Sequence, residues 1–195
     1  MRCSEINRVT NETSISICLE IDGKGKSSID SGCPFLDHML TLLACHGRFN
    51  LNIKCQGDTE VDYHHTVEDI GIVLGQAFNN AVGNKKGIKR YGDIILPMDE
   101  SLILVAIDIS NRTYLNYQVD GLKDKVGDFD SELIEEFFFA FTRSFPLTLH
   151  IKKLEGKNTH HILEAIFKAF ARSLKEALTL DQEYIDEIPS SKGML

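Results

Sequence analysis

An internal repeat constrains the fold of this chain more than any other feature of its sequence. At an offset of 96 residues, "FNLNI", which begins at Phe49, aligns with "FPLTL", which begins at Phe145, and "HHTVE" aligns with "HHILE". Nearer the N-terminus the offset is 88, so that the segment from Glu12 overlays the segment from Glu100. A period of about 90 residues that occurs only twice predicts two similar halves rather than a solenoid. We therefore expect one compact unit made of residues 1–92 and 93–180, followed by a tail of residues 181–195.

The strand pattern predicts an α+β fold in which each half has the order β-β-α-β-α. Apolar and polar residues alternate from Ile15 to Ile21, as a half-buried strand requires. The matching segment "SLILVAIDI" is apolar throughout, so we expect it to be covered on both faces. Each half should contain a mixed or antiparallel sheet with its helices on one face. Residues 83–97 form the join between the halves, with a possible extra strand left open.

Helices are expected at two places in each half. The first pair covers residues 34–47, with Pro34 in the first turn, and about residues 130–145, with Asp130 as N-cap. The second pair runs from about His64 to Val82 and from about His160 to Leu178, where apolar residues recur at helical spacing.

Composition excludes several classes of partner. A net charge of −8 without a basic stripe argues against binding to nucleic acid or to an anionic membrane, and favours small-molecule partners. There is no apolar run long enough to span a bilayer and no signal or transit segment, so we expect a cytoplasmic protein. Five cysteines without a C-x-x-C pair indicate reduced thiols rather than a disulfide framework.

The repeated His-His-x-x-Glu motif points to metal binding. On a helix, Glu68 projects about 40° from His64 and about 60° from His65, so the carboxylate lies between the two imidazoles. The adjacent imidazoles diverge by about 100°, so both can be ligands only if they serve two ions or face a junction between elements. Imidazole with carboxylate suits Mn, Fe, Zn or Ni. The alternative is a solvated helix face, but that would not explain a motif that persists while its neighbours Asp69/Ala165 and Gly71/Phe167 diverge.

Two further histidines are candidate ligands. His38 lies on the first expected helix, and His150 lies on the strand before the second motif; each alone would more often be an ordinary hydrogen-bonded residue. Together they bring the set to six histidines and two glutamates, enough for two octahedral ions with open positions for substrate and water. His46, near the end of a helix, is interpreted as structural.

At this point the sequence resembles the imidazoleglycerol-phosphate dehydratase family of histidine biosynthesis. The similarity covers nearly the whole chain, through "RVTNETSI", "FLDHML", "HHTVEDIGIVLGQA", "RYGDIILPMDE", "GDFDSELIEEFF", "HHILEAIFKAFARSL" and "SSKGML". The resemblance implies a duplicated half-domain, two Mn²⁺ ions per active site, and a 24-subunit homo-oligomer whose sites form between subunits and include the C-terminal tail. One position departs from the family pattern: Leu42 stands where members commonly carry Gln.

The resemblance also implies a role for individual residues. The metal ligands it implies are His38, His64, His65, Glu68, His150, His160, His161 and Glu164. The catalytic acid/base carboxylate falls on Glu12, and the repeat places Glu100 at the equivalent position. The phosphate-binding residues it implies are Arg90, Arg112, Lys168, Ser190 and Lys192, and Lys168 lies one turn beyond Glu164 on the same helical face.

The implied reaction explains a site with two ions. D-erythro-imidazoleglycerol phosphate must lose a hydroxyl group and a proton from C2, which has no neighbouring carbonyl to acidify it. A metal-bound imidazolate of the substrate could expel the hydroxide, after which a carboxylate removes the C2 proton to give imidazoleacetol phosphate.

Two other functions are compatible with the motif. A dinuclear metallohydrolase would act on phosphoesters or amides without requiring an imidazole. A metal-storing or structural shell would assemble with metal but show no turnover, and would leave the basic residues unexplained.

Overall fold

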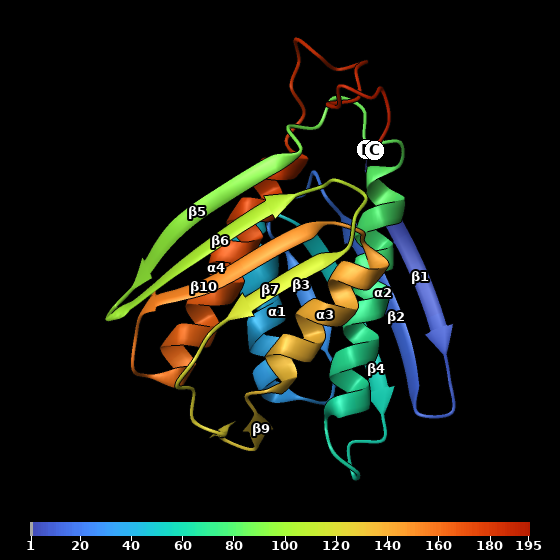
Figure 1. The fold of residues 1–195 in the computed structure, drawn as a ribbon. Coiled ribbons are helices and arrows are strands. Elements are labelled where there is room, and N and C mark those ends of the chain that lie inside the picture. The colour runs from blue at the N-terminus through green and yellow to red at the C-terminus, as the bar shows by residue number, and fades with distance from the viewer. Residues whose placement is uncertain (1) are drawn as a thin grey trace.

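Two four-stranded sheets form the outer layers of the protein, and four helices lie between them (Figure 1). The structure is a computed structural model, and it describes residues 2–195. Helices α1 (Pro34–Gly47) and α2 (His64–Val82) cover the inner face of the first sheet. Helices α3 (Leu133–Ser144) and α4 (Thr159–Leu178) cover the inner face of the second. This arrangement confirms the expected α+β fold with helices on one face of each sheet.

The two sheets have the same topology. The first contains β1 (Cys3–Val9), β2 (Thr13–Glu20), β4 (Asn50–Gly57) and β3 (Ser27–Asp30), in this spatial order. The second contains β5 (Tyr91–Met98), β6 (Ser101–Asp108), β10 (Thr148–Glu155) and β7 (Tyr114–Gln118). In both sheets the first three strands are antiparallel and the last strand is parallel to its neighbour.

The halves differ from the expected β-β-α-β-α order by one additional strand at the start of each. β5 lies in the join, where the sequence allows an extra strand, whereas β1 is not predicted by the sequence pattern. The sequence "CSEINRV" carries no apolar alternation, because β1 is an edge strand whose inward residues are Ser4, Ile6 and Arg8. Its assignment depends on pairing with β2, which a local pattern does not reveal.

The additional residues of the second half form a small hairpin, β8 (Lys125–Val126) and β9 (Phe129–Asp130), between β7 and α3. This hairpin corrects the expected N-cap of α3. Asp130 belongs to β9, where its carboxylate lies 3.2 Å from Lys125 Nζ, and the helix begins three residues later at Leu133. The other three helices begin and end within a residue of the expected positions.

The two halves share one core because their helices pair across the repeat. α2 packs on α3, and α1 packs on α4. Gly71 and Gly75 allow the first contact, since a Cβ atom on them would lie 2.7 Å from Phe137 O and 2.6 Å from Phe141 O. Such distances are well inside van der Waals contact, so any side chain at these positions would push α3 away.

The outer faces of the two sheets differ in polarity. Ser14, Ser16 and Cys18 are exposed on β2, whereas Leu102 and Leu104 are half-buried at the matching positions of β6. The expectation that β6 is covered on both faces is therefore wrong for the single chain: α4 covers one face only. All five cysteines are free thiols, and no helix among residues 2–195 is long and apolar enough to cross a bilayer.

Candidate metal and catalytic site

The two His-His-x-x-Glu motifs occupy the first turns of α2 and α4. In each helix a side chain two residues before the first histidine accepts a hydrogen bond from that histidine's backbone N–H. Asp62 Oδ1 accepts from His64 N at 2.7 Å, and Asn158 Oδ1 accepts from His160 N at 3.0 Å. Asp62 and Asn158 are themselves related by the offset of 96, so the repeat in the sequence extends to these two residues. The repeat therefore holds both histidine pairs at the start of a helix.

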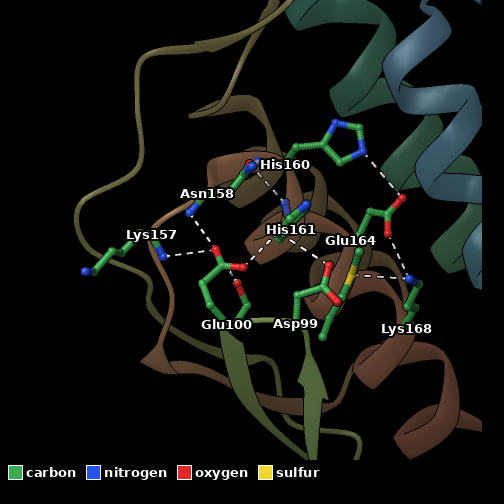
Figure 2. A network of polar contacts seen from close by, with 10 residues as sticks. Asp99, Glu100, Lys157, Asn158, His160, His161, Glu164 and Lys168 are labelled. Carbon is green, nitrogen blue, oxygen red and sulfur yellow. Dashed lines mark hydrogen bonds and ion pairs between the residues drawn. The ribbon is translucent and has the colours of Figure 1, made fainter.

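His38, His160 and Glu164 form a compact group of potential metal ligands. Their ligand atoms lie within 4.8 Å of one another. Glu164 Oε1 lies 2.5 Å from His38 Nε2 of α1 and 3.4 Å from His160 Nε2. The other oxygen of Glu164 accepts a hydrogen bond from Lys168 Nζ at 2.8 Å (Figure 2). Two imidazoles and a carboxylate at this spacing fit a divalent cation such as Mn²⁺ or Zn²⁺.

Glu164 is strongly biased toward its ionised form. Burial raises the pKa of its carboxyl group, but the hydrogen bonds and positive charges of Lys168 and His38 outweigh burial and bring the pKa to about 2. The carboxylate is therefore available as a ligand throughout the physiological pH range.

The first motif has different surroundings. Glu68 Oε2 lies 4.0 Å from His64 Nε2, and Glu68 Oε1 accepts a hydrogen bond from Arg143 of α3 at 2.8 Å. His65 Nδ1 lies 3.0 Å from Asp58 Oδ2, and its Nε2 lies 3.8 Å from Glu12 Oε1. The hydrogen bond to Asp58 raises the pKa of His65. Asp58 and Arg143 were not singled out in the sequence, because no local pattern links either residue to the motif.

His161 of the second motif is bound by Glu100. Its Nδ1 lies 2.8 Å from Glu100 Oε2, and this contact raises the pKa of His161 (Figure 2). Glu100 also accepts hydrogen bonds from the backbone N–H groups of Asn158 and Lys157. The hydrogen bonds from His161 and Asn158 lower the pKa of Glu100 to about 2.

The remaining predicted residues lie apart from the compact group. His150, on β10, has its Nδ1 3.1 Å from Asn116 Nδ2. Arg90 donates to Asp108 at 2.6 Å and to Pro189 O at 2.8 Å, and Arg112 lies 3.6 Å from Asp108. Ser190 and Lys192 follow in the tail, where Ser190 Oγ accepts from Lys192 N at 3.2 Å. Within residues 2–195, only His38, His160 and Glu164 of the eight predicted ligands form a group of three. Leu42 is a half-buried residue packed against the core, one turn beyond His38.

A cavity of about 380 Å³ adjoins the compact group. Its lining includes His38, His160 and Tyr63, residues of the β8–β9 hairpin, and the apolar rings of Phe35 and Phe129. The rings of Phe35 and Phe129 are 5.0 Å apart, and those of Tyr63 and Phe129 are 6.5 Å apart. A second hollow, of about 560 Å³, is also lined by His160, together with His161, Glu100 and the lysines Lys123, Lys125 and Lys157. The histidines thus border space that is large enough for a small anionic molecule.

Fold and site together define a duplicated α+β protein whose paired His-His-x-x-Glu helices carry an imidazole and carboxylate site suited to a divalent metal. Residues 31–174 match the model of the imidazoleglycerol-phosphate dehydratase family. The imidazoleglycerol-phosphate dehydratase of Oceanobacillus iheyensis is 55% identical over 195 residues, which cover 100% of both chains. That of Caldicellulosiruptor saccharolyticus is 54% identical, with 100% of this chain and 98% of the relative covered. The chain therefore belongs to the imidazoleglycerol-phosphate dehydratase family, and it is an enzyme of that family, as the sequence motifs indicate.

Solved structures of the family have the same fold. The Staphylococcus aureus imidazoleglycerol-phosphate dehydratase superposes with a TM-score of 0.84 at 45% identity, covering 92% of this chain and 99% of the other. The Pyrococcus furiosus enzyme, in complex with (S)-C348, gives a TM-score of 0.84 at 37% identity, covering 97% and 100%. The duplicated halves are therefore a property of the family fold.

Proposed function

We propose that this enzyme is a manganese-dependent dehydratase that converts D-erythro-imidazoleglycerol phosphate to imidazoleacetol phosphate and water in L-histidine biosynthesis. Family membership supports the reaction class. The observation that carries the proposal furthest is the group of His38, His160 and Glu164, with the Lys168 ammonium 2.8 Å from Glu164. Two imidazoles, a carboxylate and a cation thus lie in one place, which suits a site for a metal and a phosphate ester.

The proposed cofactor is Mn²⁺, with two ions per active site. The residues that would hold them are His38, His64, His65, Glu68, His150, His160, His161 and Glu164. When bound, Mn²⁺ would withdraw electron density from the imidazole ring of the substrate and make its N–H group more acidic.

The side chains of the protein would supply the proton transfer. The substrate loses hydroxide from the carbon beside the ring and a proton from C2, and the resulting enol tautomerises to the ketone. A carboxylate must accept the C2 proton, for which the sequence offers Glu12 and Glu100. Glu12 is the more accessible, because its side chain is 52% exposed and its carboxylate accepts no hydrogen bond from residues 2–195.

The phosphate group would be bound by Arg90, Arg112, Lys168, Ser190 and Lys192. Arg90 and Arg112 already share Asp108, and the tail reaches Arg90 through the carbonyl of Pro189. These contacts support a joint role for the two arginines and the tail. Lys168 lies elsewhere, on α4 beside Glu164.

Self-association would complete the site. Only three of the eight proposed ligands meet within one described chain, so the others need a second copy to form a site for two ions. A homo-24-mer with sites between subunits, as the family resemblance implies, would satisfy this requirement.

Turnover of imidazoleglycerol phosphate by chelator-treated protein, assayed with Mn²⁺, Zn²⁺, Mg²⁺ or no metal, tests the proposal. We expect the ketone product to form with Mn²⁺ and to be absent from the metal-free sample. Intact substrate with every metal, while the protein still binds and assembles with metal, would instead favour a metal-dependent shell. Hydrolysis of phosphoesters that lack an imidazole would favour a metallohydrolase.

A further inference from the structure

In the second half, both carboxylate oxygens of Glu100 accept hydrogen bonds, one of them from His161. Its Oε2 accepts the Nδ1–H of His161 at 2.8 Å, because an ionised carboxylate can only accept. Its Oε1 accepts the backbone N–H of Asn158 at 2.8 Å and of Lys157 at 3.3 Å (Figure 2). With the proton fixed on Nδ1, the free electron pair of His161 is on Nε2.

In the first half, the equivalent residue Glu12 does not accept the Nδ1–H group of its histidine, His65. The Nδ1–H of His65 is accepted by Asp58 Oδ2 at 3.0 Å, so the free electron pair of His65 is again on Nε2. The nearest oxygen of Glu12 lies 3.8 Å from that Nε2 atom. The two halves therefore fix the same tautomer with carboxylates that come from different places in the repeat.

Asp58 has no counterpart in the second half. At the offset of 96 it corresponds to Leu154, whose side chain cannot accept a hydrogen bond. β10 continues past this position to Glu155 after a register shift. β4 instead ends at Gly57, so the chain leaves the first sheet and Asp58 lies beside His65. The backbone N–H of Asp58 also donates to Glu12 O at 3.1 Å, which links the two residues.

Without its hydrogen bond to His65, the carboxylate of Asp58 would destabilise the folded state. Its Oδ1 atom is buried and has no hydrogen-bond partner among residues 2–195. Burying an unpaired carboxylate oxygen opposes folding, and the bond to His65 is the side-chain contact that offsets it.

We propose that Asp58 and Glu100 are positioning residues that present His65 and His161 to the metal through Nε2, and that Asp58 thereby frees Glu12 to move a proton. This inference rests on the proposed function, and it assigns different roles to Glu12 and Glu100 although the repeat makes them equivalent. Carboxylates that bind the second nitrogen of a ligand histidine fix its tautomer and orientation, and their loss typically weakens metal binding about 10- to 100-fold.

The Mn²⁺ affinity of the full chain can be measured by electron paramagnetic resonance of the free ion. It distinguishes the positioning residues Asp58 and Glu100 from Glu12, which moves a proton. Asp58→Ala and Glu100→Ala should each weaken binding about 10- to 100-fold. Asp58→Asn and Glu100→Gln should recover most of the affinity, because the amide oxygen still accepts from Nδ1–H. Glu12→Gln should bind Mn²⁺ like the unaltered protein but lose turnover. Glu60→Ala, an exposed carboxylate of the same loop, is the matched control and should change neither.

The outcomes distinguish this inference from the function on which it rests. No binding of Mn²⁺ by the unaltered protein would overturn the proposed function and this inference with it. Normal Mn²⁺ binding and turnover in the unaltered protein, with unchanged affinity in Asp58→Ala, would overturn this inference alone. Equal loss of affinity in Asp58→Asn and Asp58→Ala, or a similar loss in Glu12→Gln, would also overturn it.

Discussion

The two halves of the chain place the same motif at the start of the same helix but give its carboxylate different partners. Glu164 is buried, and His38 and Lys168 hold its two oxygens. Glu68 is about a third exposed, and its strongest contact is with Arg143 of the opposite half. Lys168 corresponds to Ile72 at the offset of 96, so the first half has no lysine at this position.

This difference separates what the repeat fixes from what it leaves variable. The strand order and helix positions recur because each half must bury the same kind of apolar face. The charged neighbours of the motif do not recur, because the equivalent helices α1 and α3 bring different side chains, His38 and Arg143, to the two carboxylates. The duplicated frame therefore sets where the motifs lie, and the contacts across the repeat set what each can bind.

The largest expected effect comes from removing one histidine in each half. His160→Ala and His64→Ala should each lower kcat/KM and Mn²⁺ affinity by more than about 100-fold, since loss of a ligand should exceed the effect of losing its hydrogen-bonded partner. The measurements are steady-state turnover and metal content after gel filtration. Near-normal values in His64→Ala alone would mean that only the second motif binds the ion.

A smaller effect is expected from the lysine that only the second half carries. Lys168→Met should lower kcat/KM about 10- to 100-fold, because a hydrogen bond from a charged group contributes about 1.5–3 kcal/mol. Ile72→Met, at the equivalent position of α2, is the control and should leave kcat/KM nearly unchanged. Similar losses in both variants would indicate a packing effect rather than a role of the ammonium group.

The smallest effect concerns the acid stability of the metal-free protein. The pKa of Glu164 falls from its usual value of 4.5 to about 2 in the folded chain, so its stabilising contribution is present above pH 4.5 and is lost as the pH falls toward 2. The unaltered protein should therefore exceed Glu164→Gln in melting temperature at pH 6, and the difference should narrow by pH 3. A difference that stays constant over this range would show that the pairing with Lys168 and His38 does not stabilise the fold.

The sequence predicted the parts of this structure that depend on local pattern. The helix from His64 to Val82 and its counterpart were predictable because apolar residues recur at helical spacing within each. Edge strand β1 was not predictable in this way, because only pairing with β2 defines it. Asp130 is not a cap because it pairs with Lys125 in a β-hairpin that precedes α3.

The residues of the candidate site likewise divide into those that a sequence pattern predicts and those that only the fold brings together. The motif histidines were found because they repeat, and His38 because it could be added to the same ligand count. Arg143 is 75 residues from Glu68 along the chain, and no sequence pattern relates them. Asp58 lies seven residues before His65 but outside the helix that carries the motif, so their contact follows from the path of the chain after β4.

The crossed pairing of the helices bears on the ancestry of the protein. Because α2 packs on α3 and α1 on α4, each half meets the other as one subunit of a twofold dimer meets its twin. A half-length ancestor could have built the same interior by self-association, before residues 83–90 joined the copies. Gly71 and Gly75 of α2 correspond to Phe167 and Ala171 of α4, so the two helices are not interchangeable. Two copies of either half alone would therefore not rebuild the same interior.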